Sequence, residues 1–199
     1  MTADPETLAF YNDNAEAYAN FATENAGHPR FKSFVAALPE AARVLDFGCG
    51  TGWAAAAMIE AGYTADAMDA SAGLAEVALK RYGLTVKVAA FRTLSRRARY
   101  DAIWCHFALQ HADRADRPQI FERMGTALKP GGLLYLSSQK GPRDWRDDHG
   151  RLYCPFRKDE LTELLNDAGF ETPEFEFGTG KMYDGTSTLN IYATATRNG

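Results

Sequence analysis

The chain has 199 residues, a formal net charge of -4 and a pI near 5.6, with 46% hydrophobic and 24% charged residues. This length and composition fit one domain with a sizeable core. The acidic balance argues against a nucleic-acid binder, which usually carries a basic excess. No stretch approaches about 18 consecutive apolar residues, so none is predicted to span a membrane.

The cysteines and the N-terminus indicate where such a protein works. Cys49, Cys105 and Cys154 are far apart and form no CxxC pair, so neither a disulfide framework nor a metal site is predicted. A reducing, cytoplasmic setting fits this pattern. The first residues lack a basic segment followed by an apolar run, and we therefore expect no signal peptide.

The first half of the chain predicts helices that alternate with short apolar strands. Apolar residues at spacings of three and four predict one helix over 5–21 and a second near 31–38. Ser71 is expected to cap a helix that ends before Gly83. The remaining elements expected in this half are a strand over 42–47, a helix over 52–62, and strands over 63–70 and 85–90.

The second half continues the alternation and then ends on two strands without a helix between them. A strand over 100–106 precedes a helix that runs to Lys129, for which Asp116 is the expected N-cap and Gln119 its partner. The other elements expected here are a strand over 133–139, a polar loop over 140–151, an amphipathic helix over 158–168, and strands near 170–177 and 187–196.

This order predicts the fold class. Strands alternating with helices indicate βαβ units, and strands that are apolar on both faces indicate a sheet covered by helices on both faces. The two final strands should form a hairpin, which places one antiparallel strand at or near the sheet edge. The sequence therefore predicts an α/β, Rossmann-like fold with a mostly parallel, seven-stranded sheet.

The stretch "VLDFGCGTGW", residues 44–53, carries the main functional signal. Glycines at 48, 50 and 52 follow a predicted strand and precede a predicted helix, so backbone N–H groups can approach a ligand at the carboxyl end of the sheet. Gly50-x-Gly52-x-x-Ala55 also matches the relaxed dinucleotide fingerprint. A plain strand-to-helix turn would explain one or two of these glycines.

Two acids separate the possible ligands. Asp46 would repel the pyrophosphate of a dinucleotide but would favour a ligand that carries a cation. Asp69 ends the second predicted strand, where a carboxylate can accept hydrogen bonds from the hydroxyl groups of a ribose. Its alternative role is to cap the following helix.

These stretches resemble the class I methyltransferases that use S-adenosylmethionine. The resemblance lies in "VLDFGCGTG", "AMDAS", "YDAIWCHFALQH" and "ALKPGGLLYLS", and it covers about residues 40–138. "RADRPQIFERM" and "GRLY" are similar to small bacterial methyltransferases grouped with tellurite-resistance proteins. The resemblance implies a single domain with an N-terminal helical lid over 1–39, a cofactor-binding half over 40–139, and a substrate loop, helix and terminal hairpin over 140–199.

The resemblance also implies which residues bind the cofactor, S-adenosylmethionine. Asp46 would face its ammonium group, and Asp69 would bind its ribose. Adenine would lie near Ala90 and Phe91, although the acid that the family often has there is missing from this sequence. The full set that the resemblance places around the cofactor is Asp46, Gly48, Cys49, Gly50, Gly52, Asp69, Ala70, Ala90, Phe91, Tyr11 and Tyr18.

Residues beside the methyl group are expected to serve the acceptor. His106 ends the fourth predicted strand and is the expected catalytic base, needed only if the acceptor must lose a proton. Each of these residues also has a purely structural alternative. His106 and His111 could be packed or capping imidazoles, Tyr11 and Tyr18 could be core residues, and the loop over 140–153 could be a solvated surface loop. The residues expected to contact the substrate are His111, Arg143, Arg151 and Tyr153.

The sequence therefore predicts an S-adenosylmethionine-dependent methyltransferase that acts on a small-molecule acceptor by in-line transfer. An NAD(P)-dependent oxidoreductase, an RNA or DNA methyltransferase and a non-catalytic S-adenosylmethionine binder are the alternatives. The acidic charge and the "CHFA" stretch, which replaces an Asn/Asp-Pro-Pro-aromatic tetrapeptide, argue against nucleic acid as the substrate. The sequence indicates neither the acceptor nor the oligomeric state.

Overall fold

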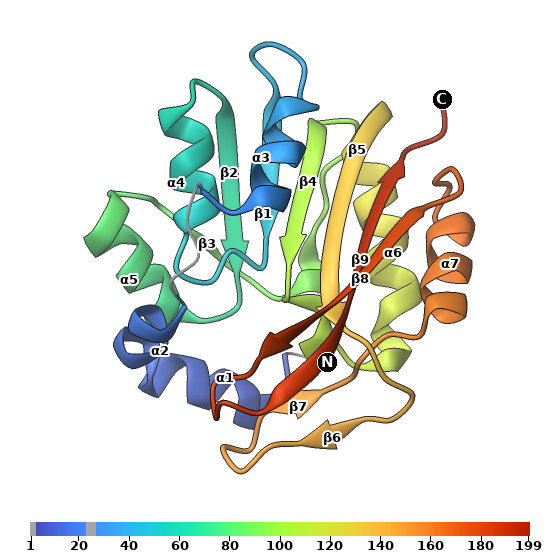
Figure 1. The fold of residues 1–199 in the computed structure, drawn as a ribbon. Coiled ribbons are helices and arrows are strands. Elements are labelled where there is room, and N and C mark those ends of the chain that lie inside the picture. The colour runs from blue at the N-terminus through green and yellow to red at the C-terminus, as the bar shows by residue number, and fades with distance from the viewer. Residues whose placement is uncertain (1–2, 23–26) are drawn as a thin grey trace.

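A computed structural model describes residues 3–22 and 27–199 of the chain (Figure 1). One seven-stranded sheet has the order β3-β2-β1-β4-β5-β9-β8, and β6 and β7 form a separate two-stranded ribbon. The strands are β1 (Arg43–Phe47), β2 (Thr64–Asp69), β3 (Lys87–Val88), β4 (Tyr100–His106), β5 (Leu128–Gln139), β6 (Trp145–Arg146), β7 (Leu152–Tyr153), β8 (Glu174–Lys181) and β9 (Ser187–Thr196).

The sheet confirms the predicted fold class. The strands β3, β2, β1, β4 and β5 pair in parallel, whereas β9 pairs antiparallel with both β5 and β8. The antiparallel strand lies next to the sheet edge, as the hairpin predicts. The α-helices are α1 (Pro5–Asp13), α2 (Ala15–Phe21), α3 (Pro29–Ala36), α4 (Trp53–Glu60), α5 (Ala72–Tyr82), α6 (Arg117–Ala127) and α7 (Lys158–Asp167).

Helices cover both faces of the sheet and bury two apolar clusters. On one face, Phe31 and Phe34 of α3 pack with Met58 of α4 against Trp104 of β4. On the other face, α6 and α7 pack Phe121 and other apolar side chains against the sheet. Helix α5 packs beside α4 over β2, where Ala55 and Ala78 are fully buried. Small side chains at these positions let the helices lie close to the strands.

The predicted N-terminal helix over 5–21 is wrong in one respect, because the structure divides it into α1 and α2 at Asn14. The Asn14 backbone leaves the helical region, and its side-chain amide donates to the Phe10 carbonyl at 3.0 Å. An asparagine side chain that bonds the backbone in this way competes with the regular helical pattern. The chain therefore bends at Asn14 while α1 and α2 remain neighbours.

The predicted helix caps have mixed outcomes. The Ser71 hydroxyl accepts from the backbone N–H of Leu74 at 3.1 Å, which confirms it as the cap of α5. Asp116 lies at the N-cap position of α6, as predicted, but its side chain makes no capping hydrogen bond. Asp113 instead accepts from the backbone N–H of Ala115 at 2.9 Å and begins a short 3₁₀ turn that leads into α6.

Several boundaries also differ from the prediction. Helix α6 ends at Ala127 and β5 begins at once, and β3 is shorter than the predicted strand over 85–90. The predicted polar loop over 140–151 contains β6, which pairs with β7 to form the small ribbon. Within the described part of the chain, no helix has both the length and the apolar character that crossing a bilayer requires.

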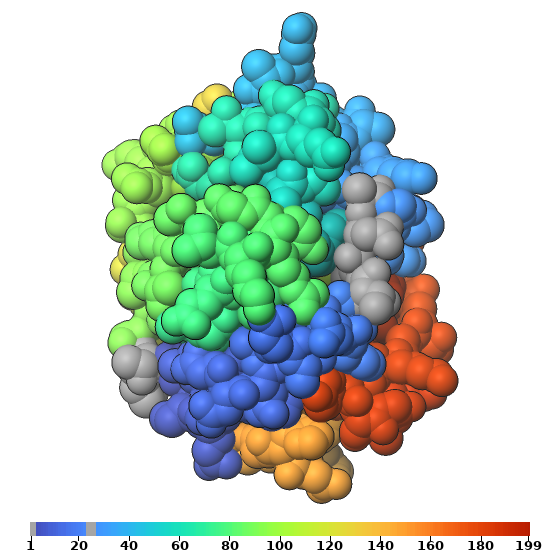
Figure 2. Space-filling model, turned by 90° about the vertical axis from the view of Figure 1, so that its left-hand side faces the viewer, coloured from blue at the N-terminus to red at the C-terminus, as the bar shows by residue number. Residues whose placement is uncertain are grey.

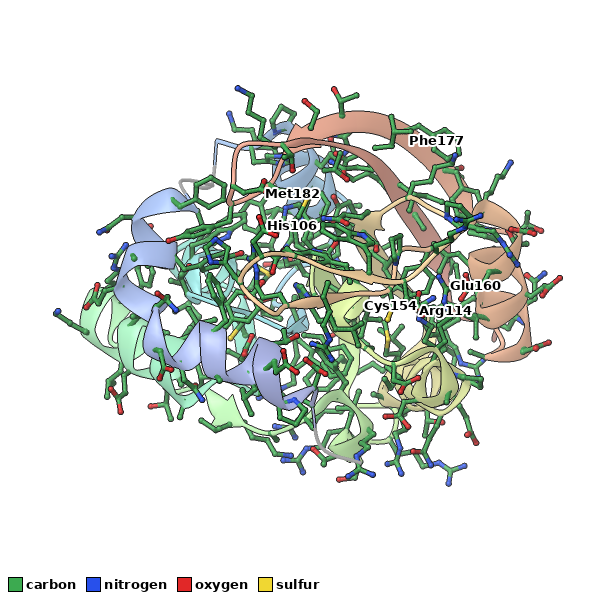
Figure 3. All side chains as sticks on the ribbon, turned by 90° about the horizontal axis from the view of Figure 1, so that it is seen from below. His106, Arg114, Cys154, Glu160, Phe177 and Met182 are labelled. Carbon is green, nitrogen blue, oxygen red and sulfur yellow. The ribbon has the colours of Figure 1, made fainter. Side chains whose placement is uncertain are left out.

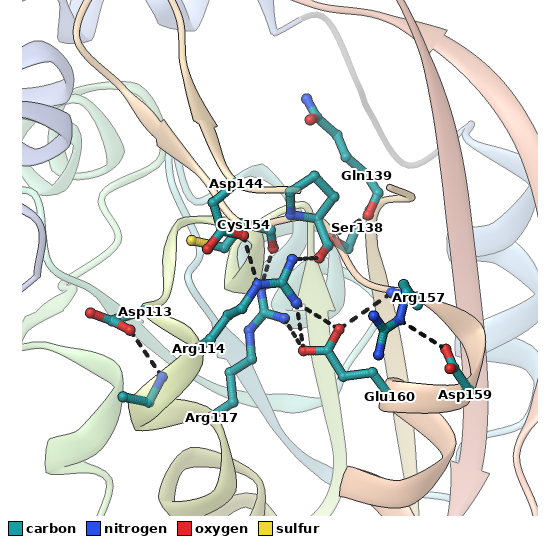
Figure 4. A network of polar contacts seen from close by, with 12 residues as sticks. Asp113, Arg114, Arg117, Ser138, Gln139, Asp144, Cys154, Arg157, Asp159 and Glu160 are labelled. Atoms are coloured by element: carbon teal, nitrogen blue, oxygen red, sulfur yellow. Dashed lines mark hydrogen bonds and ion pairs between the residues drawn. The ribbon is translucent and has the colours of Figure 1, made fainter. Parts of the chain in front are cut away.

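The segment that follows β5 is anchored by arginines (Figure 4). Arg114 forms hydrogen bonds with both carboxylate oxygens of Glu160 at 2.9 and 2.8 Å and with Asp144 at 2.7 Å. The buried Arg117 also binds Glu160 and the Cys154 carbonyl. These bonds fix the path of residues 144–160 between α6 and α7.

The N-terminal helices and the β6–β7 ribbon lie beyond the carboxyl ends of the parallel strands (Figure 1). In the space-filling view, the blue N-terminal helices lie below green α5, beside the red β8–β9 hairpin and above the orange segment with β6 and β7 (Figure 2). Three parts of the chain that are far apart in sequence therefore meet at the end of the sheet where ligands bind in open α/β folds.

Candidate active site

A cavity of about 860 Å³ opens at the carboxyl ends of the parallel strands. Its walls come from the glycine-rich turn after β1, the ends of β2 and β4, the N-terminal helices, β7 and the β8–β9 hairpin. His106 and Met182, both of which line it, lie between the N-terminal helices and the hairpin in the view from below (Figure 3). The cavity has the size of typical small-ligand sites.

The three glycines of the turn have different surroundings. A Cβ atom built on Gly50 would meet no other atom within 4 Å, so the turn leaves open space at this cavity-lining position. A Cβ atom on Gly52 would lie 2.7 Å from Leu84 and 2.9 Å from Ala78, and Gly52 does not line the cavity. Gly48 also lines the cavity, but a Cβ atom there would collide with the Ala108 side chain, whereas Gly52 lets α4 pack against α5.

Asp46 lies behind the turn and not in the cavity wall. Its side chain is buried, and its Oδ2 atom accepts from the backbone N–H of Ala55 at 3.0 Å in the first turn of α4. Burial raises the pKa of Asp46 to about 7, and the hydrogen bond from Ala55 opposes that rise. The structure thus gives Asp46 a capping role, and a ligand cation would meet its charge across the turn.

Asp69 connects the glycine turn to the start of α5. Its two carboxylate oxygens accept from the backbone N–H groups of Gly50 at 2.8 Å and of Ser71 at 2.9 Å. Desolvation raises the pKa of this carboxyl group above its usual value, against the effect of the two hydrogen bonds. Each oxygen keeps a further lone pair, so a ligand in the cavity can still donate to Asp69.

The predicted adenine region lies beside the turn. Ala70, Ala90 and Phe91 line the cavity, as does Cys49, whose thiol is buried. The Phe91 ring packs edge-on against Phe47 at a centroid distance of 5.0 Å, so its position is set by the core. This region offers apolar surface and backbone groups at the positions where the family often has an acid.

His106 ends β4 and lines the cavity. Its Nδ1 atom is 2.9 Å from the Ser137 hydroxyl on β5, and its ring stacks on Trp104 at a centroid distance of 5.2 Å. Both neighbours hold the imidazole at the cavity wall. The structure therefore supplies a positioned imidazole at the end of β4.

His111 forms a pair with Tyr11 of α1. The Tyr11 hydroxyl and His111 Nε2 are 3.0 Å apart, and His111 Nδ1 is 2.6 Å from the Leu152 carbonyl. Desolvation lowers the pKa of His111 to about 4, so the ring is neutral near pH 7. A neutral ring that donates through Nδ1 to the Leu152 carbonyl accepts a hydrogen bond from the Tyr11 hydroxyl at Nε2. The Tyr18 ring packs edge-on against Tyr11 at 5.0 Å and also lines the cavity.

Arg151 is buried among aromatic rings. Its guanidinium forms an ion pair with Asp147 at 2.7 Å, and both side chains are 2% exposed. The rings of Phe10, Tyr153 and Tyr183 lie 4.4, 5.4 and 5.4 Å from the guanidinium carbon. We call Arg151, Asp147 and these three rings the Arg151 cluster. It joins α1, β7 and the turn between β8 and β9.

The predicted substrate residues are thus only partly brought together. His111, Arg151 and Tyr153 line the cavity. Arg143 is exposed and does not line it, because the chain leaves β5 and runs along the outside before β6 begins. An arginine in this position meets solvent, so the structure does not support its predicted contact with an acceptor.

The model of a family described as "Methyltransferase domain" matches residues 18–174. The chain belongs to this methyltransferase family. A curated relative, a ubiquinone biosynthesis O-methyltransferase of Xanthomonas oryzae, is 34% identical over 105 residues, which cover 49% of this chain and 43% of the relative. The chain thus spans less than half the length of the curated relatives it matches.

Solved methyltransferase structures share the fold. A Burkholderia thailandensis 1,6-didemethyltoxoflavin-N1-methyltransferase has a TM-score of 0.74 and 23% identity, covering 98% of this chain and 88% of that one. A Haemonchus contortus phosphoethanolamine N-methyltransferase has a TM-score of 0.76 and 16% identity, covering 97% of this chain and 60% of that one. The narrower resemblance to tellurite-resistance proteins stays a prediction.

Some residues of this methyltransferase site were missed by sequence reasoning. The Asn12 side chain accepts from the Ser71 hydroxyl at 2.8 Å and so ties α1 to the end of β2. Met182 and Tyr183 reach the cavity from the hairpin turn, and Asn190 reaches it from β9. The sequence signal for this contact was the glycine at position 73, in the first turn of α5. A Cβ atom on Gly73 would lie 2.6 Å from the backbone carbonyl oxygen of Asn12.

Proposed function

We propose that this protein is an S-adenosylmethionine-dependent methyltransferase that acts on a small-molecule acceptor. One observation carries the proposal: the glycine turn and the Asp69 carboxylate open into the same cavity as the imidazole of His106. The glycine turn and Asp69 suit a nucleoside that bears an amino acid group, and the His106 imidazole would lie at the far side of that ligand. Membership of the methyltransferase family supports this assignment over an oxidoreductase.

The residues present fit the proposed cofactor. Gly50 leaves space for a ligand to approach the backbone, and Asp69 has lone pairs left for the ribose hydroxyl groups. Ala90 and Phe91 offer an apolar surface for adenine, and the ionised form of Asp46 would favour an ammonium group across the turn. The Burkholderia and Haemonchus enzymes described above were solved with S-adenosylhomocysteine and S-adenosylmethionine, respectively.

The chain's own contribution to the chemistry is orientation and proton handling. When bound, the cofactor supplies an activated methyl group, so the protein needs to align the acceptor for in-line displacement. His106 would accept the proton of a hydroxyl or amine acceptor, while the Ser137 hydroxyl holds the ring in place. Tyr11 and His111 would hold α1 across the opening as part of the lid over 1–39, of which residues 1–2 and 23–26 lie outside the described structure.

The walls favour a small acceptor. The N-terminal helices, β7 and the hairpin turn surround the cavity and are joined through the Arg151 cluster, so an acceptor would be enclosed on several sides. The names of the relatives refer to ubiquinone biosynthesis, 1,6-didemethyltoxoflavin and phosphoethanolamine. We therefore propose that nucleic acid is not the substrate.

Binding of S-adenosylhomocysteine tests the cofactor assignment. We expect wild-type protein to bind it in isothermal titration, and Asp69→Ala to weaken binding by about 10- to 100-fold, since a hydrogen bond to a charged group contributes about 1.5–3 kcal/mol. Asp148→Ala, which removes an exposed acid outside the cavity, is the matched control and should bind like wild type. Absence of binding at about millimolar ligand, or an Asp69→Ala variant that is folded and binds normally, would contradict the assignment.

An assay of methyl transfer distinguishes a small-molecule methyltransferase from a nucleic-acid methyltransferase and from a non-catalytic binder. Radiolabelled S-adenosylmethionine would be incubated with a panel of phenols, amines, thiols and metalloid oxyanions, and separately with RNA and duplex DNA. We expect label in a small molecule and none in nucleic acid. Label in RNA or DNA would replace the small-molecule proposal, and binding without turnover on the whole panel would favour a non-catalytic binder.

A further inference from the structure

Asn190 on β9 carries a buried polar atom that the proposed chemistry does not use. The residue is 3% exposed and lines the cavity. Its Nδ2 atom donates to the Tyr192 hydroxyl oxygen at 3.3 Å, whereas its Oδ1 atom forms no hydrogen bond with any residue that the structure describes. Buried amide oxygens in folded proteins normally have a partner, so an oxygen without one among the described residues, on a side chain that lines the cavity, is unusual.

The hairpin fixes the orientation of this amide. Asn190 pairs with Gly178 across the hairpin, and Gly180 is the next residue of β8 on the same face. A Cβ atom on Gly180 would lie only 2.7 Å from Asn190 Nδ2, and one on Gly178 would lie 3.4 Å from the Tyr192 ring. The absence of side chains at 178 and 180 therefore gives the amide its place at the wall.

Aromatic side chains connect Asn190 to the catalytic region. The Tyr192 ring is covered on one side by the Arg30 guanidinium at 3.7 Å, and the Phe107 ring meets it edge-on at 6.1 Å. Phe107 also contacts His106, with centroids 4.7 Å apart. Its φ of +50° is unusual for a residue with a bulky side chain, and strain of this kind is concentrated at functional sites.

We infer that Asn190 determines acceptor specificity, with its Oδ1 atom accepting a hydrogen bond from an O–H or N–H group on an aromatic methyl acceptor. Phe107 and Tyr192 provide the apolar surface against which such a ring packs, and His106 lies at the other end of the same wall. A site built to bond a donor discriminates strongly against an analogue that lacks it, because the buried oxygen is then left unpaired. This inference rests on the proposed function, since it concerns the acceptor half of the same cavity.

Phenol and anisole serve as probes, because they share a ring and an oxygen atom but anisole carries a methoxy group in place of the O–H donor. Protein saturated with S-adenosylhomocysteine would be titrated with each probe, and binding followed by nuclear magnetic resonance, including the side-chain amide signals of Asn190. We expect about tenfold tighter binding of phenol than of anisole. Only phenol should shift the Asn190 amide signals strongly.

Variants at position 190 test whether the tighter binding of phenol than of anisole depends on Asn190. Asn190→Leu replaces the amide with an apolar group of similar size and should reduce the phenol preference to near unity. Asn190→Asp keeps an oxygen at the position of Oδ1 and should retain the preference. Thr188→Val is the matched control on the same face of β9, because the Thr188 hydroxyl already donates to the Leu189 carbonyl at 3.3 Å. It should bind both probes like wild type.

The outcomes separate this inference from the proposed function. Failure of the wild-type protein to bind S-adenosylhomocysteine would overturn the proposed function. If that ligand binds but phenol and anisole bind equally, or neither binds, the role of Asn190 is overturned alone. A phenol preference that persists in a folded Asn190→Leu variant has the same consequence. A preference that is lost in Asn190→Leu and kept in Asn190→Asp supports the inference.

Discussion

At the scale of single residues, His111 shows how a contact between distant parts of the chain sets a protonation state. Its ring nitrogens bond Tyr11 and the Leu152 carbonyl, and desolvation lowers its pKa to about 4. The ordinary histidine value is about 6.5, so the unfolded chain binds this proton first when the pH falls. The contribution of His111 to stability is therefore complete above pH 6.5 and is lost as the pH falls towards 4.

We predict a pH-dependent difference in stability between wild type and His111→Gln, whose amide can replace both hydrogen bonds. The wild-type advantage in the free energy of unfolding should shrink by up to about 3 kcal/mol between pH 7 and pH 4. Urea unfolding of both proteins at several pH values measures it. The raised pKa of Asp46 has the opposite sign, because it lowers stability as the pH rises from about 4 to about 7. Since both proteins contain Asp46, its effect cancels in the difference. A constant difference across this range would contradict the prediction.

At the scale of elements, α1 is fixed over the cavity by contacts of unequal strength. The Arg151–Asp147 pair is almost fully buried, and Phe10 of α1 packs on its guanidinium. Arg146 also reaches α1 by pairing with Asp4 at 2.7 Å, but the Arg146 side chain is 39% exposed. Exposed pairs contribute about 0–1 kcal/mol, whereas loss of one partner from a buried pair costs about 3–5 kcal/mol.

We therefore predict that Arg151→Met loosens α1 and that Arg146→Met does not. In Arg151→Met, amide hydrogen exchange of residues 5–21 should accelerate by about 100-fold relative to β4, because about 3 kcal/mol corresponds to that ratio. Arg146→Met is the matched control, and its exchange should change less than about fivefold. Equal acceleration in the two variants would show that the Arg151 cluster has no special role in holding α1.

At the scale of the whole molecule, the cavity joins elements from both ends of the chain, so a ligand bound there should stabilise the entire fold. At a ligand concentration about 100 times the dissociation constant, binding adds about 2.7 kcal/mol to stability. For a domain of this size we predict that S-adenosylhomocysteine raises Tm by about 5–11 °C. Differential scanning calorimetry measures this shift. Asp69→Ala should show a much smaller shift at the same concentration, and an unchanged Tm in wild type would contradict the prediction.

The sequence by itself determined the fold class and much of the cavity wall beside the glycine turn. Alternation of apolar strands with helices encodes the parallel sheet, because each element must bury one face, and the two final strands encode the antiparallel hairpin. The glycine turn and the Ser71 cap are local features, whereas the bond from the Gly50 N–H to Asp69 joins positions far apart in sequence and depends on the pairing of β1 with β2. Even here Asp46 and Gly52 were placed in the ligand wall by analogy, whereas packing directs them to α4 and α5.

Only the tertiary structure decided the opposite wall of the cavity. Tyr11 meets His111 across 100 positions of sequence, and the Arg151 cluster collects side chains from α1, β7 and the hairpin turn. Asn190 becomes a cavity residue through the register of β8 with β9, while Arg143 is left outside by the path of its loop. Periodicity records which face of an element is buried, but not which distant element covers it. That choice depends on side-chain packing and loop paths, which are properties of the whole folded chain.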